Sequence, residues 1–207
     1  MHLITGGSSG IGRALIQKLV ESGEQVVSIG RSKPIVDCQW VEADLLDIEE
    51  LPTLKGPFKS IVFCAAMQER HRTQWDWHEW KLHMEVNCFS QAALFEKLDQ
   101  ENSLIDFPYI VVMGSKASEG SVSYPAYGMS KAAFWTYWRC KYLQRNRRLA
   151  VNQLWPGRVA TPGNPRRAID DLNGYRDPTD IVPTILWLMG LTDEVVPVLQ
   201  TIDLGVI

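Results

Sequence analysis

The chain has 207 residues with a formal net charge of −3, and 45% of its residues are hydrophobic. This length supports one sizeable core and is too short for two ordinary domains, so one domain over residues 1–207 is expected. A slightly acidic chain without a long basic run argues against nucleic acid and membranes as partners. The longest mostly apolar stretch, Ile181 to Leu191, is too short to span a bilayer and contains Pro183.

The N-terminal residues and the cysteines both indicate a cytoplasmic protein. The strand-like run His2-Leu3-Ile4 comes directly before a glycine turn and leaves no room for a signal peptide. The cysteines are far apart and have no CxxC spacing; they are Cys38, Cys64, Cys88 and Cys140. This pattern argues against a disulfide framework or a zinc site and predicts unpaired, buried thiols in a reducing compartment. No metal ion is expected.

Short apolar runs alternate along the chain with segments of helical period. We expect strands at Leu3–Thr5, Gln25–Ile29, Cys38–Ala43, Ser60–Cys64, Tyr109–Met113, Leu149–Leu154 and Val198–Asp203. Helices are expected around Ile11, Leu15 and Leu19 and over Trp77–Leu98, Ala126–Arg145 and Thr179–Met189. Several strands are almost continuously apolar, which is typical of strands covered on both faces. The pattern predicts an α/β fold, a doubly wound parallel sheet of about seven strands with helices on both faces.

A glycine-rich turn joins the first strand to the first helix. Its sequence is TGGSSGIG, from Thr5 to Gly12. Glycine permits a positive φ in such a turn and lets the backbone approach a pyrophosphate. Free N–H groups and the positive end of the helix dipole then face the anion. The turn predicts cofactor contacts at Gly6, Ser8, Ser9, Gly10, Ile11 and Gly12; the alternative is a glycine turn without a ligand.

The end of the second strand predicts the choice of cofactor. Rossmann-like proteins recognise the adenosine ribose there, with a carboxylate for NAD or an arginine for the 2′-phosphate of NADP. Gly30 stands where the carboxylate would be, and Arg31 and Ser32 can bind a phosphate. NADP(H) is therefore the preferred cofactor, with NAD(H) possible. A solvated Arg31 is the alternative, and Ser9 weakens the case because many NADP-preferring relatives have a second basic residue there.

A tyrosine and a lysine four residues apart are the most specific feature of the chain. Tyr127 and Lys131, within YGMSK, project from one face of a predicted helix, one turn apart. A nearby ammonium favours phenolate, so the pKa of Tyr127 should fall from about 10 toward neutrality. Such a phenol can give a proton to a carbonyl oxygen and recover it from an alcohol.

Together these motifs resemble those of the short-chain dehydrogenase/reductase family, in that family's order and over essentially the whole chain. TGGSSGIG resembles the TGxxxGIG turn of the family, and Tyr127 and Lys131 resemble its Tyr-Lys pair. The resemblance implies a Rossmann-like fold and hydride transfer between NADP(H) and a small carbonyl or alcohol substrate, with Tyr127 as acid/base. It also implies that Ser115 polarises the substrate oxygen and that Asn87 holds a water joining Lys131 to solvent. Ser115 lies 12 residues before Tyr127, so its loop is one residue shorter than is common.

Further cofactor contacts follow from the resemblance. Asp44 and Leu45 resemble a pair whose aspartate contacts the adenine, although Asp44 could equally cap the next helix. Ala65 and Ala66 leave room for the adenosine ribose, whereas Met67 replaces the usual glycine and leaves the local backbone conformation open. The stretch after the sixth strand resembles the PGxVxT loop of the family, which implies nicotinamide contacts at Pro156, Gly157, Val159 and Thr161.

The segment Gly163–Asp177 is expected to cover the substrate, because it follows the nicotinamide loop and is rich in glycine, proline and arginine. Its arginines Arg166, Arg167 and Arg176 either meet an anionic substrate or are solvated. The substrate itself cannot be identified from the sequence.

The resemblance also bears on assembly and on rival functions. The helices of Asn87 and Tyr127 are candidate subunit contacts, with apolar area from Phe134, Trp135 and Trp138, and predict a homodimer or homotetramer. Two other functions stay open. One is an NADP-binding regulator or scaffold with little catalysis, which Met67 and the short substrate segment favour. The other is an epimerase or lyase on the same fold, for which the substrate region is short.

Overall fold

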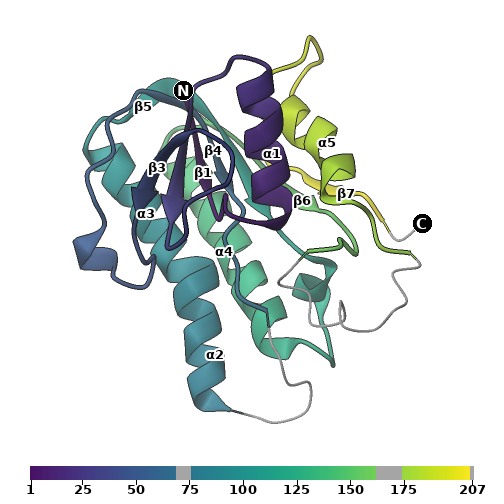
Figure 1. The fold of residues 1–207 in the computed structure, drawn as a ribbon. Coiled ribbons are helices and arrows are strands. Elements are labelled where there is room, and N and C mark those ends of the chain that lie inside the picture. Colours follow the sequence, from purple (N-terminus) through teal and green to yellow (C-terminus); the bar gives the residue numbers. More distant parts are fainter. Residues whose placement is uncertain (69–75, 162–173, 206–207) are drawn as a thin grey trace.

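The computed structural model describes residues 1–68, 76–161 and 174–205, which form a parallel sheet flanked by helices (Figure 1). The strands are β1 (His2–Thr5), β2 (Val26–Gly30), β3 (Gln39–Glu42), β4 (Phe58–Phe63), β5 (Leu104–Met113), β6 (Ala150–Trp155) and β7 (Thr201–Asp203). Neighbouring strands pair in parallel in the order β3-β2-β1-β4-β5-β6-β7. The predicted doubly wound, Rossmann-like sheet is confirmed.

The helices follow the strands as crossover connections. They are α1 (Gly10–Glu21), α2 (Trp77–Met84), α3 (Ser90–Gln100), α4 (Pro125–Gln144) and α5 (Val182–Leu188). A π-helical segment, η2 (Glu85–Phe89), joins α2 to α3. Short 3₁₀ turns are η1 (Ile48–Glu50), η3 (Lys116–Glu119) and η5 (Pro178–Ile181).

The strand order reverses at β1 and β4. β1 is hydrogen-bonded to β2 on one side and to β4 on the other. The chain therefore leaves β1 toward one face of the sheet, as α1, and leaves β4 toward the opposite face, as α2 and α3. A crevice opens between these connections at the carboxyl ends of the strands, where folds of this kind bind their ligands.

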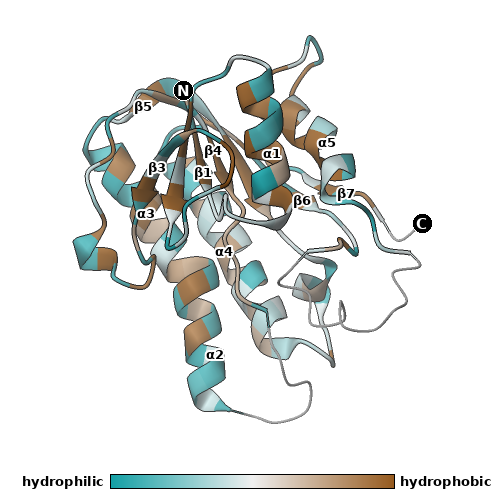
Figure 2. Ribbon diagram, in the orientation of Figure 1, coloured by the Kyte–Doolittle hydropathy of each residue, from teal (hydrophilic) through white to brown (hydrophobic). Residues whose placement is uncertain are grey.

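The two faces of the sheet are packed by different side chains. Helices α3 and α4 cover what we call the aromatic face, whose core includes Phe63, Phe95, Phe134 and Trp138. Helices α1 and α5 cover the aliphatic face, where the described buried core consists of Val, Leu, Ile and Met. Figure 2 shows brown strands between helices that carry both brown and teal residues. Phe134 and Trp138 are 1% and 0% exposed, so the prediction that they supply a subunit contact is wrong.

Several predicted elements differ from the observed ones in extent, and β5 begins at Leu104 rather than at Tyr109. The helix predicted over Trp77–Leu98 is divided by η2, which contains Asn87. β7 is shorter than predicted because Leu199 has a left-handed φ of 58°, which an extended strand does not allow. The last predicted helix begins with η5, which Asp177 caps, and Pro183 lies in the first turn of α5, where no N–H is needed.

The cysteines are unpaired, as predicted, but they are not all buried. Cys88 is buried, Cys38 and Cys64 are half-buried, and Cys140 is exposed on α4. The expectation of four buried thiols is therefore wrong, because Cys140 lies on the side of its helix that faces away from the sheet. Within the described residues, no helix is long and apolar enough to cross a membrane.

Candidate active site

The glycine turn after β1 lies against neighbouring backbone at two points. Gly6 has a φ of +70°, and a Cβ there would lie 2.7 Å from the backbone nitrogen of Ala65. A Cβ on Gly12 would lie 2.4 Å from the carbonyl oxygen of Gly6. Only glycine fits at both positions, and the first N–H groups of α1 have no acceptor within the helix. A pyrophosphate can therefore approach the backbone of this turn closely, next to the positive end of the α1 helix dipole.

The loop after β4 forms the opposite wall and is fixed by hydrogen bonds. The Ala65 N–H donates to Thr5 Oγ1 at 3.0 Å, and Gln91 Nε2 donates to the Ala65 carbonyl at 3.0 Å. Thr5 Oγ1 in turn donates to Gln91 Oε1 at 3.3 Å. These bonds hold Ala65 against the glycine turn, where its small side chain and that of Ala66 leave room for a ribose.

Asn87 joins this loop to α4. Its Oδ1 accepts from the Met67 N–H at 2.7 Å, and its Nδ2 donates to the Met67 carbonyl at 2.8 Å and to Ser130 Oγ at 3.0 Å. Ser130 Oγ donates to the Tyr127 carbonyl at 2.8 Å. The two bonds to Met67 fix the local backbone although the usual glycine is missing. Asn87 itself is fully buried behind the cleft wall, and its role in holding a water stays a prediction.

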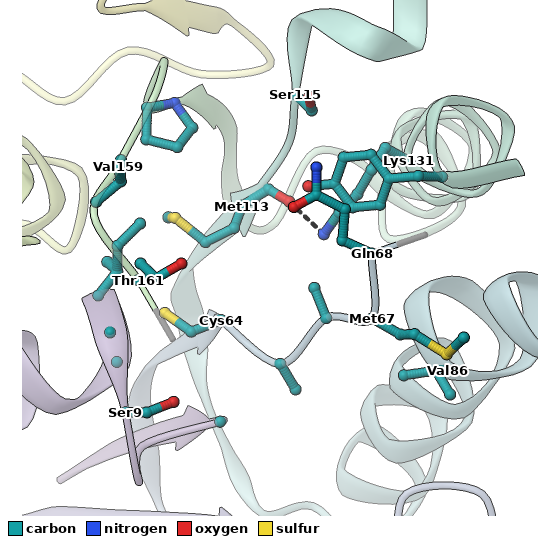
Figure 3. Close-up of a pocket in the computed structure, with 18 of the residues that line it drawn as sticks. Ser9, Cys64, Met67, Gln68, Val86, Met113, Ser115, Lys131, Val159 and Thr161 are labelled. Carbon is teal, nitrogen blue, oxygen red and sulfur yellow. Dashed lines mark hydrogen bonds between the residues drawn. The ribbon is translucent and has the colours of Figure 1, made fainter. Parts of the chain in front are cut away.

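Tyr127 and Lys131 lie one turn apart on the side of α4 that faces the crevice. Lys131 is only 2% exposed. Its Nζ donates to the Met113 carbonyl at 2.8 Å and lies 5.6 Å from the centre of the Tyr127 ring. Figure 3 shows the bond to Met113 as a dashed line, with Thr161 across the cleft. The ammonium is therefore held beside the ring by a carbonyl at the end of β5.

Burial controls the protonation of both side chains. It raises the pKa of Tyr127 to about 12, while a hydrogen bond with Ser115 acts in the opposite direction. Burial lowers the pKa of Lys131 to about 8, and the nearby Cys64 and Cys88 raise it by a smaller amount. The prediction that Lys131 brings the Tyr127 pKa toward neutrality is wrong for the protein alone, because desolvation of the phenolate dominates. Tyr127 is thus protonated at neutral pH.

Ser115 stands directly after β5, at the start of η3. Its Oγ accepts from the Ala117 N–H at 3.2 Å, and its side chain is near enough to Tyr127 to act against the rise of the tyrosine's pKa. Ser118 Oγ donates to the Ser115 carbonyl at 2.7 Å and closes the turn. The shortened loop therefore still brings the serine to the tyrosine.

One cleft of about 1500 Å³ connects these groups. It is lined by nearly all of the predicted site residues: Gly6, Ser8, Ser9, Gly10, Ile11, Gly12, Arg31, Ser32, Asp44, Leu45, Ala65, Ala66, Ser115, Tyr127, Lys131, Pro156, Gly157, Val159 and Thr161. The predictions missed further lining residues, among them Gln68, Leu82, Val86, Met113, Tyr124 and Tyr175. Figure 3 shows Gln68 and Met67 on the same side of the cleft as Lys131. No local motif marks these residues, because only the fold brings them together.

Arg31 and Asp44 face each other at the end of the cleft next to β2 and β3. Arg31 Nη1 lies 3.7 Å from Asp44 Oδ2, and Asp44 Oδ1 accepts from the Leu46 N–H at 3.0 Å. The Arg31 side chain is 74% exposed, so this ion pair is weak and the guanidinium can turn to a phosphate. Asp44 both caps the following turn and borders the cleft, so its two predicted roles are compatible.

Much of the predicted substrate segment lies outside the described residues, including Arg166 and Arg167. Arg176 is described, and its Nη2 donates to the Leu204 carbonyl at 2.6 Å. This arginine therefore fixes the chain after β7. Among the described residues, no group of three or more His, Cys, Asp or Glu side chains is arranged to hold a metal ion.

Comparison with known protein families identifies the family of this chain. A model described as the NAD dependent epimerase/dehydratase family matches residues 2–170. The chain belongs to this family and has the fold of the short-chain dehydrogenases/reductases, as its motifs predicted. No curated protein matches the chain in sequence.

Solved structures of short-chain dehydrogenases superpose on almost the whole chain. A family member from Francisella tularensis has a TM-score of 0.85 at 21% identity, and the match covers 98% of this chain and 96% of that one. A short chain dehydrogenase from Salmonella enterica serovar Typhi has a TM-score of 0.82 at 26% identity, covering 98% and 94%. A short chain dehydrogenase from Shigella flexneri, complexed with NADP, has a TM-score of 0.82 at 23% identity, covering 98% and 95%.

Proposed function

We propose that the protein transfers a hydride between NADP(H) and a carbonyl or alcohol substrate. The observation that carries this proposal is that Ser115, Tyr127 and Lys131 share one cleft with the glycine turn. The family match and the relative complexed with NADP support a nicotinamide cofactor. When bound, the cofactor supplies the hydride for carbonyl reduction, and the protein orients it.

The catalytic side chains have separate tasks in this reaction. Tyr127, which is protonated at neutral pH because burial raises its pKa to about 12, gives its proton to the carbonyl oxygen. Ser115 donates a hydrogen bond to the same oxygen and steadies it. The Lys131 ammonium, held by the Met113 carbonyl beside the ring, offsets the negative charge that the phenol acquires. Lys131 also binds the nicotinamide ribose.

A panel of ketones, aldehydes and quinones tests this function. The NADPH absorbance is followed: its loss reports reduction of each compound, and its rise reports oxidation of the product alcohol by NADP⁺. We expect reversible turnover with at least one substrate class. Tight NADPH binding without turnover on any compound would contradict the proposal and favour a cofactor-binding regulator or scaffold.

The preference for NADP(H) over NAD(H) rests on Arg31 and Ser32, which border the cleft beside β2. Loss of a charge-assisted contact between a guanidinium and the 2′-phosphate should lower the affinity for NADP(H) by about tenfold or more. Arg31→Ala should therefore remove most of the preference, while Arg139→Ala, an exposed arginine on α4, should leave it unchanged. Equal affinity of the wild-type protein for both cofactors, measured by calorimetry, would exclude this preference.

Epimerase or dehydratase chemistry is the second candidate, and the name of the matching family favours it. The same tyrosine can move a proton in a reaction without net redox change. The two candidates differ in one readout, because only net hydride transfer consumes NADPH in proportion to product. Product that forms without NADPH loss would favour the second candidate.

We further propose a cytoplasmic homodimer or homotetramer with contacts through η2 and α4. Phe89 on η2 and Met129 on α4 support this, since they are 52% and 41% exposed. Light scattering that finds only the monomer mass at micromolar protein would contradict it.

A further inference from the structure

Among the described residues, one wall of the cleft has no charged side chain. The loop after β4 and the helical segments α2 and η2 form this wall, and Met67, Leu82 and Val86 are among the residues that line it. Leu82 and Val86 are four residues apart and therefore lie on the same side of the helix. Lys81 and Glu85 pair with each other at 3.6 Å and do not line the cleft. The wall therefore favours an apolar part of a substrate over an ionised one.

Gln68 brings a hydrogen-bonding side chain to this wall. It is half-buried, lines the cleft, and its side chain has no hydrogen-bond partner among the described residues. Figure 3 shows the side chain extending from the loop after β4 toward Lys131. A glutamine amide can both donate and accept hydrogen bonds. A substrate oxygen beside Gln68 therefore finds a partner that the described part of the fold does not use.

The backbone at Gln68 is held by Asn87, which is fully buried. Asn87 Nδ2 donates at 2.8 Å to the Met67 carbonyl, which belongs to the peptide bond between Met67 and Gln68. The same Nδ2 donates to Ser130 Oγ at 3.0 Å, and Ser130 directly precedes Lys131 on α4. One buried amide thus connects the backbone at Gln68 with the helix of the catalytic side chains. The place of Gln68 relative to the reacting carbonyl is therefore set by the fold.

The sheet places Gln68 one strand away from Ser115. Gln68 follows β4 and Ser115 follows β5, and these two strands are paired in parallel. Neighbouring strands are about 4.8 Å apart, so a small substrate can reach both residues at once. When Ser115 and Tyr127 hold the carbonyl oxygen, an oxygen on the next carbon atom is the one that fits this short spacing. The rest of the substrate then follows the apolar wall toward Leu82 and Val86.

We propose that Gln68 selects an uncharged acyloin as substrate, that is, a ketone whose neighbouring carbon carries a hydroxyl group and an alkyl chain. This inference rests on the proposed hydride transfer. The hydroxyl is hydrogen-bonded to the Gln68 amide, and the chain packs on Leu82 and Val86. In reduction the carbonyl carbon accepts the hydride and the carbonyl oxygen accepts the Tyr127 proton, so the products are a vicinal diol and NADP⁺.

Three matched compounds test the hydroxyl and the chain separately. The test substrate, which we call the hydroxyketone, is methyl pentyl ketone hydroxylated on the methylene next to its carbonyl. Methyl pentyl ketone itself lacks only the hydroxyl, and acetoin has the hydroxyl but a shorter chain. At saturating NADPH, kcat/KM for the hydroxyketone should exceed that for methyl pentyl ketone about tenfold. It should exceed that for acetoin about tenfold or more, because acetoin buries fewer methylenes.

Two variants and a control assign these preferences to the wall. Gln68→Met keeps the length of the side chain and removes the amide, so kcat/KM for the hydroxyketone should fall about tenfold and that for methyl pentyl ketone less than about threefold. Val86→Thr keeps the shape and adds a hydroxyl, which should cost the hydroxyketone about two- to fivefold and leave acetoin unchanged. Lys81→Gln, an exposed residue of α2 outside the cleft, is the control and should change nothing. The Kd of NADPH, measured by calorimetry, should be unchanged in all three variants.

The outcomes separate this inference from the proposed function. Equal kcat/KM for the hydroxyketone and methyl pentyl ketone, or a preference for the hydroxyketone that persists in Gln68→Met, would overturn the role of Gln68 and leave hydride transfer standing. Weaker NADPH binding in Gln68→Met would also overturn it, because Gln68 would then belong to the cofactor site. No turnover of these three compounds or of any member of the wider panel would overturn both.

Discussion

The aromatic and aliphatic faces of the sheet position different parts of the same cleft. On the aromatic face, Trp138 contacts the rings of Phe95, Phe63 and Phe134 at centroid distances of 4.6, 5.6 and 5.9 Å, in tilted or edge-on geometry. Such ring contacts depend on orientation. On the aliphatic face, α1 is held by Leu15, Ile16 and Leu19, whose packing depends mainly on shape and volume.

This difference matches what each helix contributes. Tyr127, Lys131, Phe134 and Trp138 follow one another at spacings of four, three and four residues, so they lie along one side of α4. Ring packing at Phe134 and Trp138 therefore fixes the rotation of α4 and directs Tyr127 and Lys131 into the cleft. Helix α1 contributes backbone N–H groups at its start, which point along the axis whatever the rotation of the helix. The side chains of α4 therefore depend on how the core fixes the rotation of their helix, whereas the N–H groups of α1 do not.

The largest expected effect comes from removing the centre of the aromatic face. Trp138→Ala should lower the free energy of unfolding by about 3–5 kcal/mol, because it leaves a large cavity among rings. Leu19→Ala on the aliphatic face should cost about 2–5 kcal/mol. The comparison predicts a further difference in protein that remains folded: Trp138→Ala lowers turnover, and Leu19→Ala does not.

Urea unfolding gives the stabilities, and turnover is measured per folded protein at low temperature. Trp77→Ala is the control, since this side chain is 75% exposed and should cost less than about 0.5 kcal/mol. Equal turnover in Trp138→Ala and Leu19→Ala would show that the rings do not orient α4.

The next effect separates catalysis from cofactor binding on α4. Tyr127→Phe keeps the ring and removes the proton donor, so turnover should fall about 100-fold or more while NADPH binding stays nearly unchanged. Lys131→Ala should lower both, because the proposed function also assigns Lys131 to binding the nicotinamide ribose. Tyr142→Phe, on the same helix, is the matched control. Near-normal turnover of Tyr127→Phe would remove Tyr127 as acid/base.

A smaller effect is expected at the start of α1. A Cβ on Gly12 would lie 2.4 Å from the Gly6 carbonyl oxygen, so Gly12→Ala must move the turn. NADPH affinity should fall about tenfold or more, with little change in turnover at saturating cofactor. Gly23→Ala is the control for the loss of a glycine, because a Cβ there meets nothing within 4 Å, although its φ of +78° costs some stability. If Gly12→Ala lowers turnover and leaves the NADPH affinity unchanged, the assignment of cofactor binding to α1 and of turnover to α4 is incorrect.

The sequence predicts the parts of the site that have a local signature. TGGSSGIG needs only a strand before it and a helix after it, and the spacing of Tyr127 and Lys131 places them on one helix face. The parallel strands follow from continuous apolar runs such as Ser60–Cys64. These features are encoded within a few residues, so one sequence is enough to find them.

The features that the sequence does not predict depend on distant contacts. The π-helical segment contains Asn87, whose side chain is hydrogen-bonded to the backbone of Met67, 20 residues away in the chain. The raised pKa of Tyr127 results from burial by several elements, which no motif encodes. Gln68 reaches the cleft only because the loop after β4 is fixed by Thr5 and Gln91. Helical period alone did not show that Phe134 and Trp138 face the sheet, since α4 carries apolar residues all around.

The pH dependence of carbonyl reduction tests the part that Lys131 plays on α4. Burial lowers the pKa of Lys131 to about 8, so its ammonium is present below that pH and is lost above it. We expect kcat/KM for carbonyl reduction to be level near neutrality and to fall up to tenfold per pH unit above about 8. Tyr127, with its pKa raised to about 12, stays protonated in this range. Lys131→Arg should be less active with a level profile, since arginine keeps its charge; an unchanged fall in this variant would assign the fall to another group.

The smallest effect concerns the pH dependence of stability, which we expect to depend on the buried His2 and its contacts with Ser60 and Glu24. His2 is 0% exposed, with one ring nitrogen 2.8 Å from Ser60 Oγ and the other 2.9 Å from Glu24 Oε2. Burial lowers the pKa of His2, and the hydrogen bond to His2 lowers the pKa of Glu24. Below about pH 6.5 the unfolded chain therefore binds a proton that the folded chain does not, and stability falls as the pH falls. The slope from His2 should not exceed about 1.4 kcal/mol per pH unit, and in urea unfolding between about pH 7 and 5 the variant His2→Gln should show a smaller slope. A variant with the wild-type slope would mean that acid lability arises elsewhere and that the stability of this face does not depend on the titration of His2.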